Sequence, residues 1–149
     1  MPIADDVTRQ IKDAMKAKDA TRLTTLRSMR AVFLNEMKKD GSDSLDDAVC
    51  ETLLRKLEKQ HKESIEAFTN AGRDELATNE RAELVILQEF LPRLADEAQT
   101  RNWVTAAIAE SGATDPKDIG KVMGVLMKAH KADLDGNLTR KIVQELLAP

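Results

Sequence analysis

A segment near the C-terminus spaces its basic side chains in a way that suits phosphate binding. It reads DIGKVMGVLMKAH from Asp118. At about 100° per residue, Lys117, Lys121, Gly124 and Lys128 fall within about 60° of one another on one side of a helix. Ammonium groups about 6 to 11 Å apart suit a nucleic-acid backbone, and a glycine among them admits close approach. We therefore expect these four residues to contact phosphates.

The opposite side of this helix is apolar, which leaves a second interpretation open. Its members, within about 100° of one another, are Ile119, Val122, Met123, Leu126 and His130. A helix that buries one side turns the other to water, so the lysines can equally form a solvated face. Gly120 and Gly124 would then permit close helix packing.

A second basic patch is expected near the N-terminus, from Arg22, Arg27 and Arg30. Arginine binds phosphate well because its planar guanidinium donates two parallel hydrogen bonds. The alternative is a solvated or salt-bridged flank. No aromatic residues alternate with these arginines, so no platform for stacking nucleobases is predicted. This argues against binding of single-stranded nucleic acid.

The sequence shows no self-contained catalytic or metal site. Cys50 lies within a helical pattern and is expected to be a buried structural thiol. His61 lies on an apolar stripe and His130 at a helix end, and neither has a partner at the spacing of metal ligands. Gly120-Lys121 lacks the earlier glycine and the preceding strand of a phosphate loop. We expect no metal, no cofactor and no catalytic residue, and lean against enzymatic activity of the chain alone.

The composition of the chain indicates which broad class of protein it belongs to. The chain has 149 residues, of which 42% are hydrophobic, 33% charged and 3% aromatic. No run of 18 apolar residues is present, so no membrane span is expected. The first ten residues lack the charged and apolar regions of a secretory signal, and one cysteine cannot form an internal disulfide. These features predict a soluble cytoplasmic protein.

Charge is segregated along the chain, although the net charge is only −3. Residues 9–39 carry nine Lys/Arg against three Asp/Glu, and residues 117–141 have a surplus of three positive charges. Residues 40–51 and 63–97 are acidic. Any nucleic-acid role must therefore rest on local basic patches.

The elements that must position these residues are all helical, because nearly every segment has helical period and none alternates like a strand. We predict an all-α fold: a long-helix bundle over residues 1–92, then a small three-helix C-terminal lobe over 96–149. Helices are expected over about 6–18, 20–39, 44 or 46 to 70, 73–90, 96–111 and 116–130, and from 138 on. Asn137 is the expected cap of the last helix, with Leu138, Ile142 and Leu146 as its apolar stripe.

Three stretches together resemble the YqeY-like family, and the resemblance runs the whole length of the chain. They are LRSMRAVFLNE at 26–36, ERAELVILQEFLP at 80–92 and IGKVMGVL at 119–126. The chain departs from the family pattern at Leu134, which is inserted before the Asp135-Gly136 pair and changes the turn there.

This family is similar to the tail domain of the B subunit of glutamyl/aspartyl-tRNA amidotransferase, a helical domain that holds tRNA. The resemblance implies a stand-alone tRNA-binding module related to carbon–nitrogen ligases that use glutamine as amido-N-donor. Implied partners are tRNA and amidotransferase or synthetase components. The alternative is a protein–protein interaction module that docks a partner through residues 63–97 or the C-terminal lobe.

Overall fold

The computed structural model describes all residues, 1–149, and contains seven α-helices and no strand. The all-α prediction is confirmed. The α-helices are α1 (Ile3–Ala17), α2 (Ala20–Asp40), α3 (Asp47–Asn70), α4 (Asp74–Gln88), α5 (Glu97–Ser111), α6 (Ile119–His130) and α7 (Gly136–Leu147). Two short 3₁₀ turns, η1 (Pro116–Asp118) and η2 (Lys131–Asp133), flank α6.

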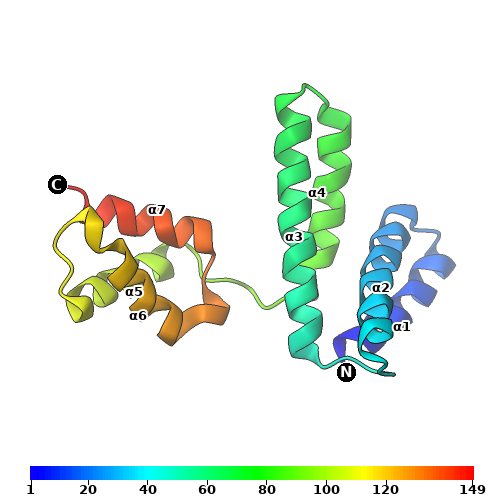
Figure 1. Cartoon of the computed structure of the whole chain (residues 1–149). Helices are drawn as coiled ribbons and strands as arrows, with labels where there is room; N and C mark the ends of the chain where they lie inside the picture. Colours follow the sequence, from blue (N-terminus) through cyan, green and yellow to red (C-terminus); the bar gives the residue numbers. More distant parts are fainter. The chain divides into compact units, whose positions relative to one another are not determined.

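The chain forms two compact units, Met1–Leu91 and Pro92–Pro149. Each unit has its own core of buried apolar side chains. The N-terminal unit contains α1 to α4, and the C-terminal unit contains α5 to α7 (Figure 1).

The N-terminal unit consists of two helical hairpins, α1 with α2 and α3 with α4. Its core joins all four helices, with Leu26, Met29 and Phe33 of α2 among its fully buried side chains. Between α2 and α3 the chain turns at Gly41, whose φ of 66° lies in the left-handed region that glycine adopts without steric cost. Helix α1 begins at Ile3 rather than near residue 6, and its Ile3 N–H donates to Asp47 Oδ1 at 2.8 Å.

The joined end of the α3–α4 hairpin extends past α1 and α2 (Figure 1). The core of this unit takes Leu54 and Leu57 from α3 and Ile86 and Leu87 from α4, whereas Ala77, the buried apolar residue between 58 and 85, lies outside that core. Over that stretch the two helices therefore depend mainly on each other for packing.

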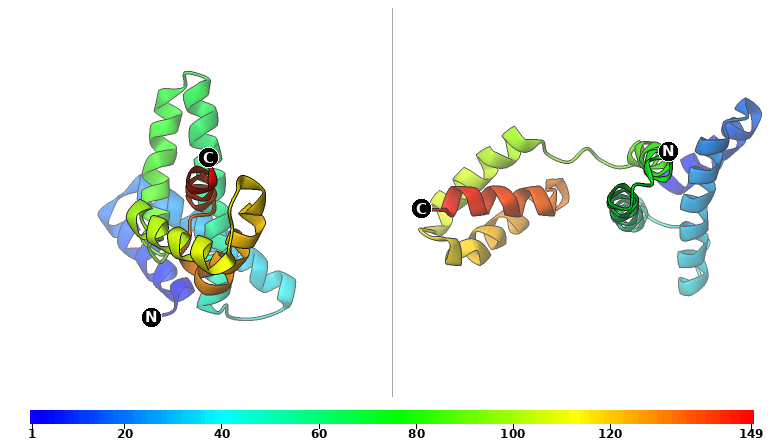
Figure 2. Two further views of the ribbon diagram at one scale, coloured as in Figure 1. Left: turned by 90° about the vertical axis from the view of Figure 1, so that its left-hand side faces the viewer. Right: turned by 90° about the horizontal axis from the view of Figure 1, so that it is seen from above.

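The C-terminal unit packs α5, α6 and α7 around one small core (Figure 2). Val104, Val122, Leu126 and Val143 are fully buried or nearly so, and they come from all three helices. Near this core the Trp103 indole stacks on the His130 imidazole, with ring centroids 3.8 Å apart. The apolar side predicted for α6 is therefore the side that it packs inward.

Several details of the C-terminal unit differ from the sequence-based prediction. Asp135, not Asn137, caps α7, because its carboxylate accepts the Leu138 N–H at 3.1 Å. Leu147 is buried, whereas Leu146 is 43% exposed. The earlier cap moves the start of α7 to residue 136, and the side of the helix that meets α5 and α6 includes Val143 and Leu147.

Candidate nucleic-acid interface

The four residues of the predicted phosphate-binding face are all exposed in the C-terminal unit. Lys121, Gly124 and Lys128 lie on α6, whereas Lys117 lies in η1, because the first turn after Pro116 is 3₁₀ rather than α-helical. A Cβ added at Gly124 would meet no atom within 4 Å. Gly124 therefore does not serve close helix packing, and we call these four residues the lysine face.

The lysine face adjoins a shallow pocket between the end of α5 and α6. Its lining residues are Glu110, Ser111, Lys121, Gly124, Val125, Lys128 and Ala129. Gly124 supplies no side chain, so the α6 backbone is accessible between the two lysines. This shape suits the approach of a bulky anionic backbone, with Glu110 as the one acidic side chain in the lining.

An acidic side chain shares the first turn of the lysine face. Asp118 Oδ1 lies 3.7 Å from Lys121 Nζ, and Asp118 Oδ2 accepts the Thr114 N–H at 3.0 Å. This backbone hydrogen bond, followed by attraction from Lys121, holds the pKa of Asp118 below its ordinary value. Asp118 therefore stays ionised and offsets part of the positive potential at Lys121.

The three arginines of the second predicted patch all lie on α2, but their contacts differ. Arg22 is half-buried and donates to Glu89 Oε2 at 2.8 Å and to the Gln10 side chain, so its guanidinium is already engaged. This pairing argues against Arg22 as a phosphate ligand. Arg27 and Arg30 are exposed on α2, and they remain the candidates for this patch.

The aromatic and thiol side chains do not add to the interface. Trp103 is stacked on His130 within its own unit, which leaves no indole face free on that side for a nucleobase. Cys50 is fully buried, as predicted, and burial followed by the nearby Asp47 charge raises its pKa. A buried thiol with a raised pKa is a poor nucleophile.

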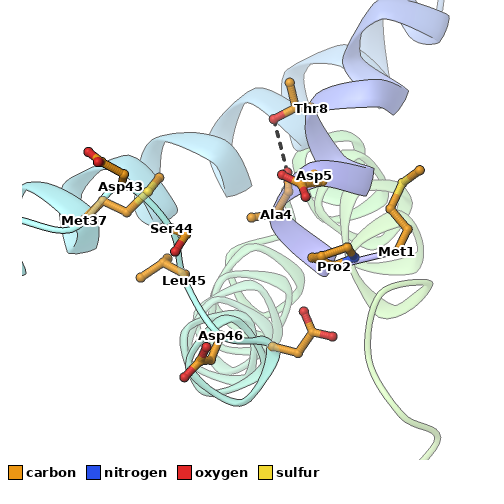
Figure 3. Close-up of a pocket in the computed structure, with 11 residues that line it drawn as sticks. Met1, Pro2, Ala4, Asp5, Thr8, Met37, Asp43, Ser44, Leu45 and Asp46 are labelled. Atoms are coloured by element: carbon orange, nitrogen blue, oxygen red, sulfur yellow. Dashed lines mark hydrogen bonds between the residues drawn. The ribbon is translucent and has the colours of Figure 1, made fainter.

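A separate pocket lies at the N-terminus, where the start of α1 meets the end of α2 and the segment that leads to α3 (Figure 3). Its acidic lining consists of Asp5, Asp43, Asp46 and Asp47. Four carboxylates at one opening repel phosphate, so this pocket does not extend a nucleic-acid interface.

One polar cluster was not predicted from the sequence. His61 of α3 faces Glu80 and Glu83 of α4, and the ligand atoms of all three lie within 4.8 Å of one another. His61 Nδ1 is 2.5 Å from Glu80 Oε2 and 3.8 Å from Glu83 Oε2. Burial, then repulsion from Glu80, raises the pKa of Glu83. Spacing along the chain gives neither histidine a metal-ligand partner, but the fold brings two carboxylates to His61.

A sequence signal for this cluster exists, but it requires the register of the hairpin. Residues 61 and 83 lie equally far from residue 72, in the turn at 71–73 that joins α3 to α4. Antiparallel helices bring such positions side by side, and the i,i+3 spacing puts Glu83 on the same side as Glu80.

These features define an all-α protein of two helical units, and the second unit exposes the four residues of the lysine face. Residues 4–147 match the family model described as "Yqey-like protein". The chain belongs to the YqeY-like family, as the sequence resemblance predicted.

Similar proteins from three fungi all carry the name "Altered inheritance of mitochondria protein 41, mitochondrial". The protein of Pyrenophora tritici-repentis is 30% identical over 140 residues, which cover 92% of this chain and 76% of the relative. That of Lachancea thermotolerans is 34% identical over 111 residues, 72% of this chain and 59% of the relative. That of Eremothecium gossypii is 35% identical over 86 residues, 58% of this chain and 47% of the relative. The last two matches thus span about half the length of those relatives.

The relatives correct the prediction of a cytoplasmic protein. Their names place them in mitochondria. The prediction rested on the absence of a membrane span, of a secretory signal and of paired cysteines, none of which carries information about a mitochondrial destination. No helix of the structure is both long and apolar enough to cross a membrane, as predicted.

Proposed function

We propose that the protein is a tRNA-binding module whose C-terminal unit contacts RNA phosphates through the lysine face. The observation that carries this proposal is the exposure of Lys117, Lys121 and Lys128 around Gly124, which has open space above its backbone. Lysine is a compact point charge without fixed geometry, so such contacts hold a phosphate backbone without reading base sequence.

The strength of this interface depends on a small number of contacts. Each phosphate contact adds about 0.7 to 0.9 to the slope of log affinity against log salt. Three lysines therefore give a slope of about 2 to 3. We expect binding that is evident at low salt and weakens steeply as salt rises.

The N-terminal unit offers Arg27 and Arg30 as a second contact to the same RNA. Both side chains are exposed on α2, and guanidinium groups favour phosphate. A long RNA such as tRNA can engage patches on two units at once, which raises overall affinity through effective concentration.

The family's likeness to a tRNA-holding tail domain suggests the biological setting, an accessory role in tRNA-dependent amidation. In that setting glutamine hydrolysis and ATP-dependent activation take place on other components, and this chain positions the tRNA. We therefore expect the purified chain alone to release no ammonia from glutamine and to hydrolyse no ATP.

A pull-down from cell extract with and without RNase tests the proposal. Recovered tRNA that disappears after RNase supports it. Protein partners that persist after RNase, with no tRNA recovered, favour the alternative of a protein-interaction module. The triple variant with Lys117, Lys121 and Lys128 replaced by Gln serves as the control, because it should recover little tRNA while folding normally.

A further inference from the structure

We infer that His61, Glu80 and Glu83 form a binding site for a first-row divalent cation, with Zn²⁺ as the best-matched ion. The site lies between α3 and α4 and is independent of the proposed RNA binding. We take His61 Nδ1, Glu80 Oε2 and Glu83 Oε2 as its ligand atoms, because that nitrogen lies 2.5 Å and 3.8 Å from the two oxygens.

The geometry fits a metal with little movement. Ligands bonded to Zn²⁺ at about 2.0 to 2.2 Å in a tetrahedron lie about 3.3 to 3.6 Å apart. The His61 nitrogen lies 2.5 Å from Glu80 and 3.8 Å from Glu83, and all three atoms lie within 4.8 Å. To reach tetrahedral separations, the His61–Glu80 distance must lengthen by about 1 Å and the His61–Glu83 distance must shorten by less than that, which requires the two glutamate side chains to rotate.

The negative charges of the cluster also favour the binding of a cation. Two carboxylates sit within 4.8 Å of each other at a half-buried interface. A protonated His61 can donate only one hydrogen from Nδ1, and Glu80 already takes that position. Glu83 is then left 3.8 Å away without that hydrogen bond. A divalent ion bonded to all three groups neutralises both carboxylates at once.

Metal binding requires His61 to be neutral, with Nδ1 as ligand and the proton on Nε2. The proton that Nδ1 shares with Glu80 leaves to solvent as the ion enters. One imidazole nitrogen and two carboxylate oxygens are ligands that Zn²⁺ accepts, and three protein ligands leave the fourth position for water.

The position of the site gives the ion a structural consequence. Between residues 58 and 85 the α3–α4 hairpin buries only the small Ala77 among its apolar side chains, and Ala77 lies outside the main core of the unit. An ion held by one residue of α3 and two of α4 would join the two helices within this stretch. Metal binding should therefore stabilise residues 58–85 of the hairpin specifically.

The experiment is a titration of the full-length, metal-free protein with Zn²⁺, followed by calorimetry and by amide hydrogen exchange. We expect one Zn²⁺ per chain and slower exchange in residues 58–85. Co²⁺ in place of Zn²⁺ should give visible d–d bands without a thiolate charge-transfer band, because Cys50 is not a ligand.

Three variants and two controls decide the result. Loss of an outer-shell partner alone typically costs about 10- to 100-fold in metal affinity, so H61A, E80Q and E83Q should each lose at least about tenfold. H130A removes the other histidine, and E63Q removes an exposed carboxylate from α3. Both controls should bind Zn²⁺ normally.

The variants E80Q and E83Q, which replace a carboxylate by an amide, keep the test decisive even if H61A does not fold. E83Q removes one of two adjacent negative charges, so in metal-free buffer it should unfold at a temperature no lower than the wild type. Its lost Zn²⁺ binding then reports a lost ligand. Absence of Zn²⁺ binding by the wild type, unchanged affinity in E80Q and E83Q, or loss of binding in H130A would each overturn the site.

Discussion

Lys121 Nζ lies 3.7 Å from Asp118 Oδ1, so a negative charge lies directly beside the lysine face. Asp118 also accepts the Thr114 N–H at 3.0 Å, which fixes it at the start of α6. Any polyanion that binds Lys121 must therefore compete with this carboxylate.

Removing the charge of Asp118 should strengthen RNA binding. In D118N the amide oxygen can still accept the Thr114 N–H, while the attraction that holds Lys121 is lost. We expect tighter tRNA binding at low salt and a salt slope steeper by up to about 1 unit. Filter binding at several salt concentrations measures both, and weaker binding by D118N would contradict the assigned role of Lys121.

Changes at Gly124 should affect stability and binding in opposite directions. A Cβ there meets nothing within 4 Å, so G124A and G124E should stabilise α6 by about 0.5 to 1 kcal/mol. G124E should nevertheless weaken tRNA binding more than any single Lys→Gln change, because it adds bulk and negative charge to the face. Q144E, which adds the same charge to an exposed position of α7, is the control. Equal binding by G124E and Q144E would remove Gly124 from the interface.

Leu134 should be a large contributor to the stability of the C-terminal unit. It is 8% exposed and packs in the core of that unit. L134A should destabilise the unit by about 2 to 5 kcal/mol, the usual cost of deleting a buried leucine side chain. L146A, at a 43% exposed position on α7, should cost far less. Denaturant unfolding followed by fluorescence of Trp103, the single tryptophan, measures both; similar losses for the two variants would contradict the packing described.

This residue also illustrates how far the sequence alone predicts the fold. Helical period and stop signals were sufficient for an all-α chain, because periodicity and turn residues are local properties. In the sequence, Leu134 was noted only as an expected departure from the family pattern. Its burial depends on how η2 and α7 meet the core, which is a tertiary property.

The candidate sites also contain features that follow from local geometry and features that depend on tertiary packing. Lys121, Gly124 and Lys128 share a side of one helix, so their common exposure follows from local geometry. Arg22 looked equivalent to Arg27 and Arg30, but Glu89 of another helix engages it. Such pairing across helices follows from spacing along the chain only when the register of the helices is known, and the His61 cluster was missed for this reason.

The start of α1 should lose stability in acid. Asp6 accepts hydrogen bonds from Arg9 at 2.7 Å and from Gln10 at 3.2 Å, and the Arg9 hydrogen bond is the main cause of its lowered pKa. Because the folded state binds this proton less tightly, the stabilisation is complete above the ordinary pKa of 3.8 and is lost as pH falls from there through the lowered value.

Replacing Arg9 therefore tests this pH dependence. R9Q should speed amide exchange in α1 at neutral pH, by the equivalent of about 0.5 kcal/mol or less for so exposed a pair, and the difference from the wild type should shrink in acid. K12Q, an equal charge loss at an exposed neighbour, is the control. A difference that grows as pH falls would have the wrong sign.

The most direct test of the proposed function is tRNA binding across a range of salt concentrations by the wild type and by the triple variant K117Q/K121Q/K128Q. The control variant K12Q/K16Q/K59Q loses the same charge from exposed positions of the N-terminal unit. We predict weaker binding by the first variant, with a salt slope flatter by about 2 to 3 units, and near-wild-type binding by the second. Surface changes of this kind typically alter stability by about 0.5 kcal/mol or less each, so folding should change little. Coincident curves for the wild type and K117Q/K121Q/K128Q, or no tRNA binding by the wild type at low salt, would contradict the proposal.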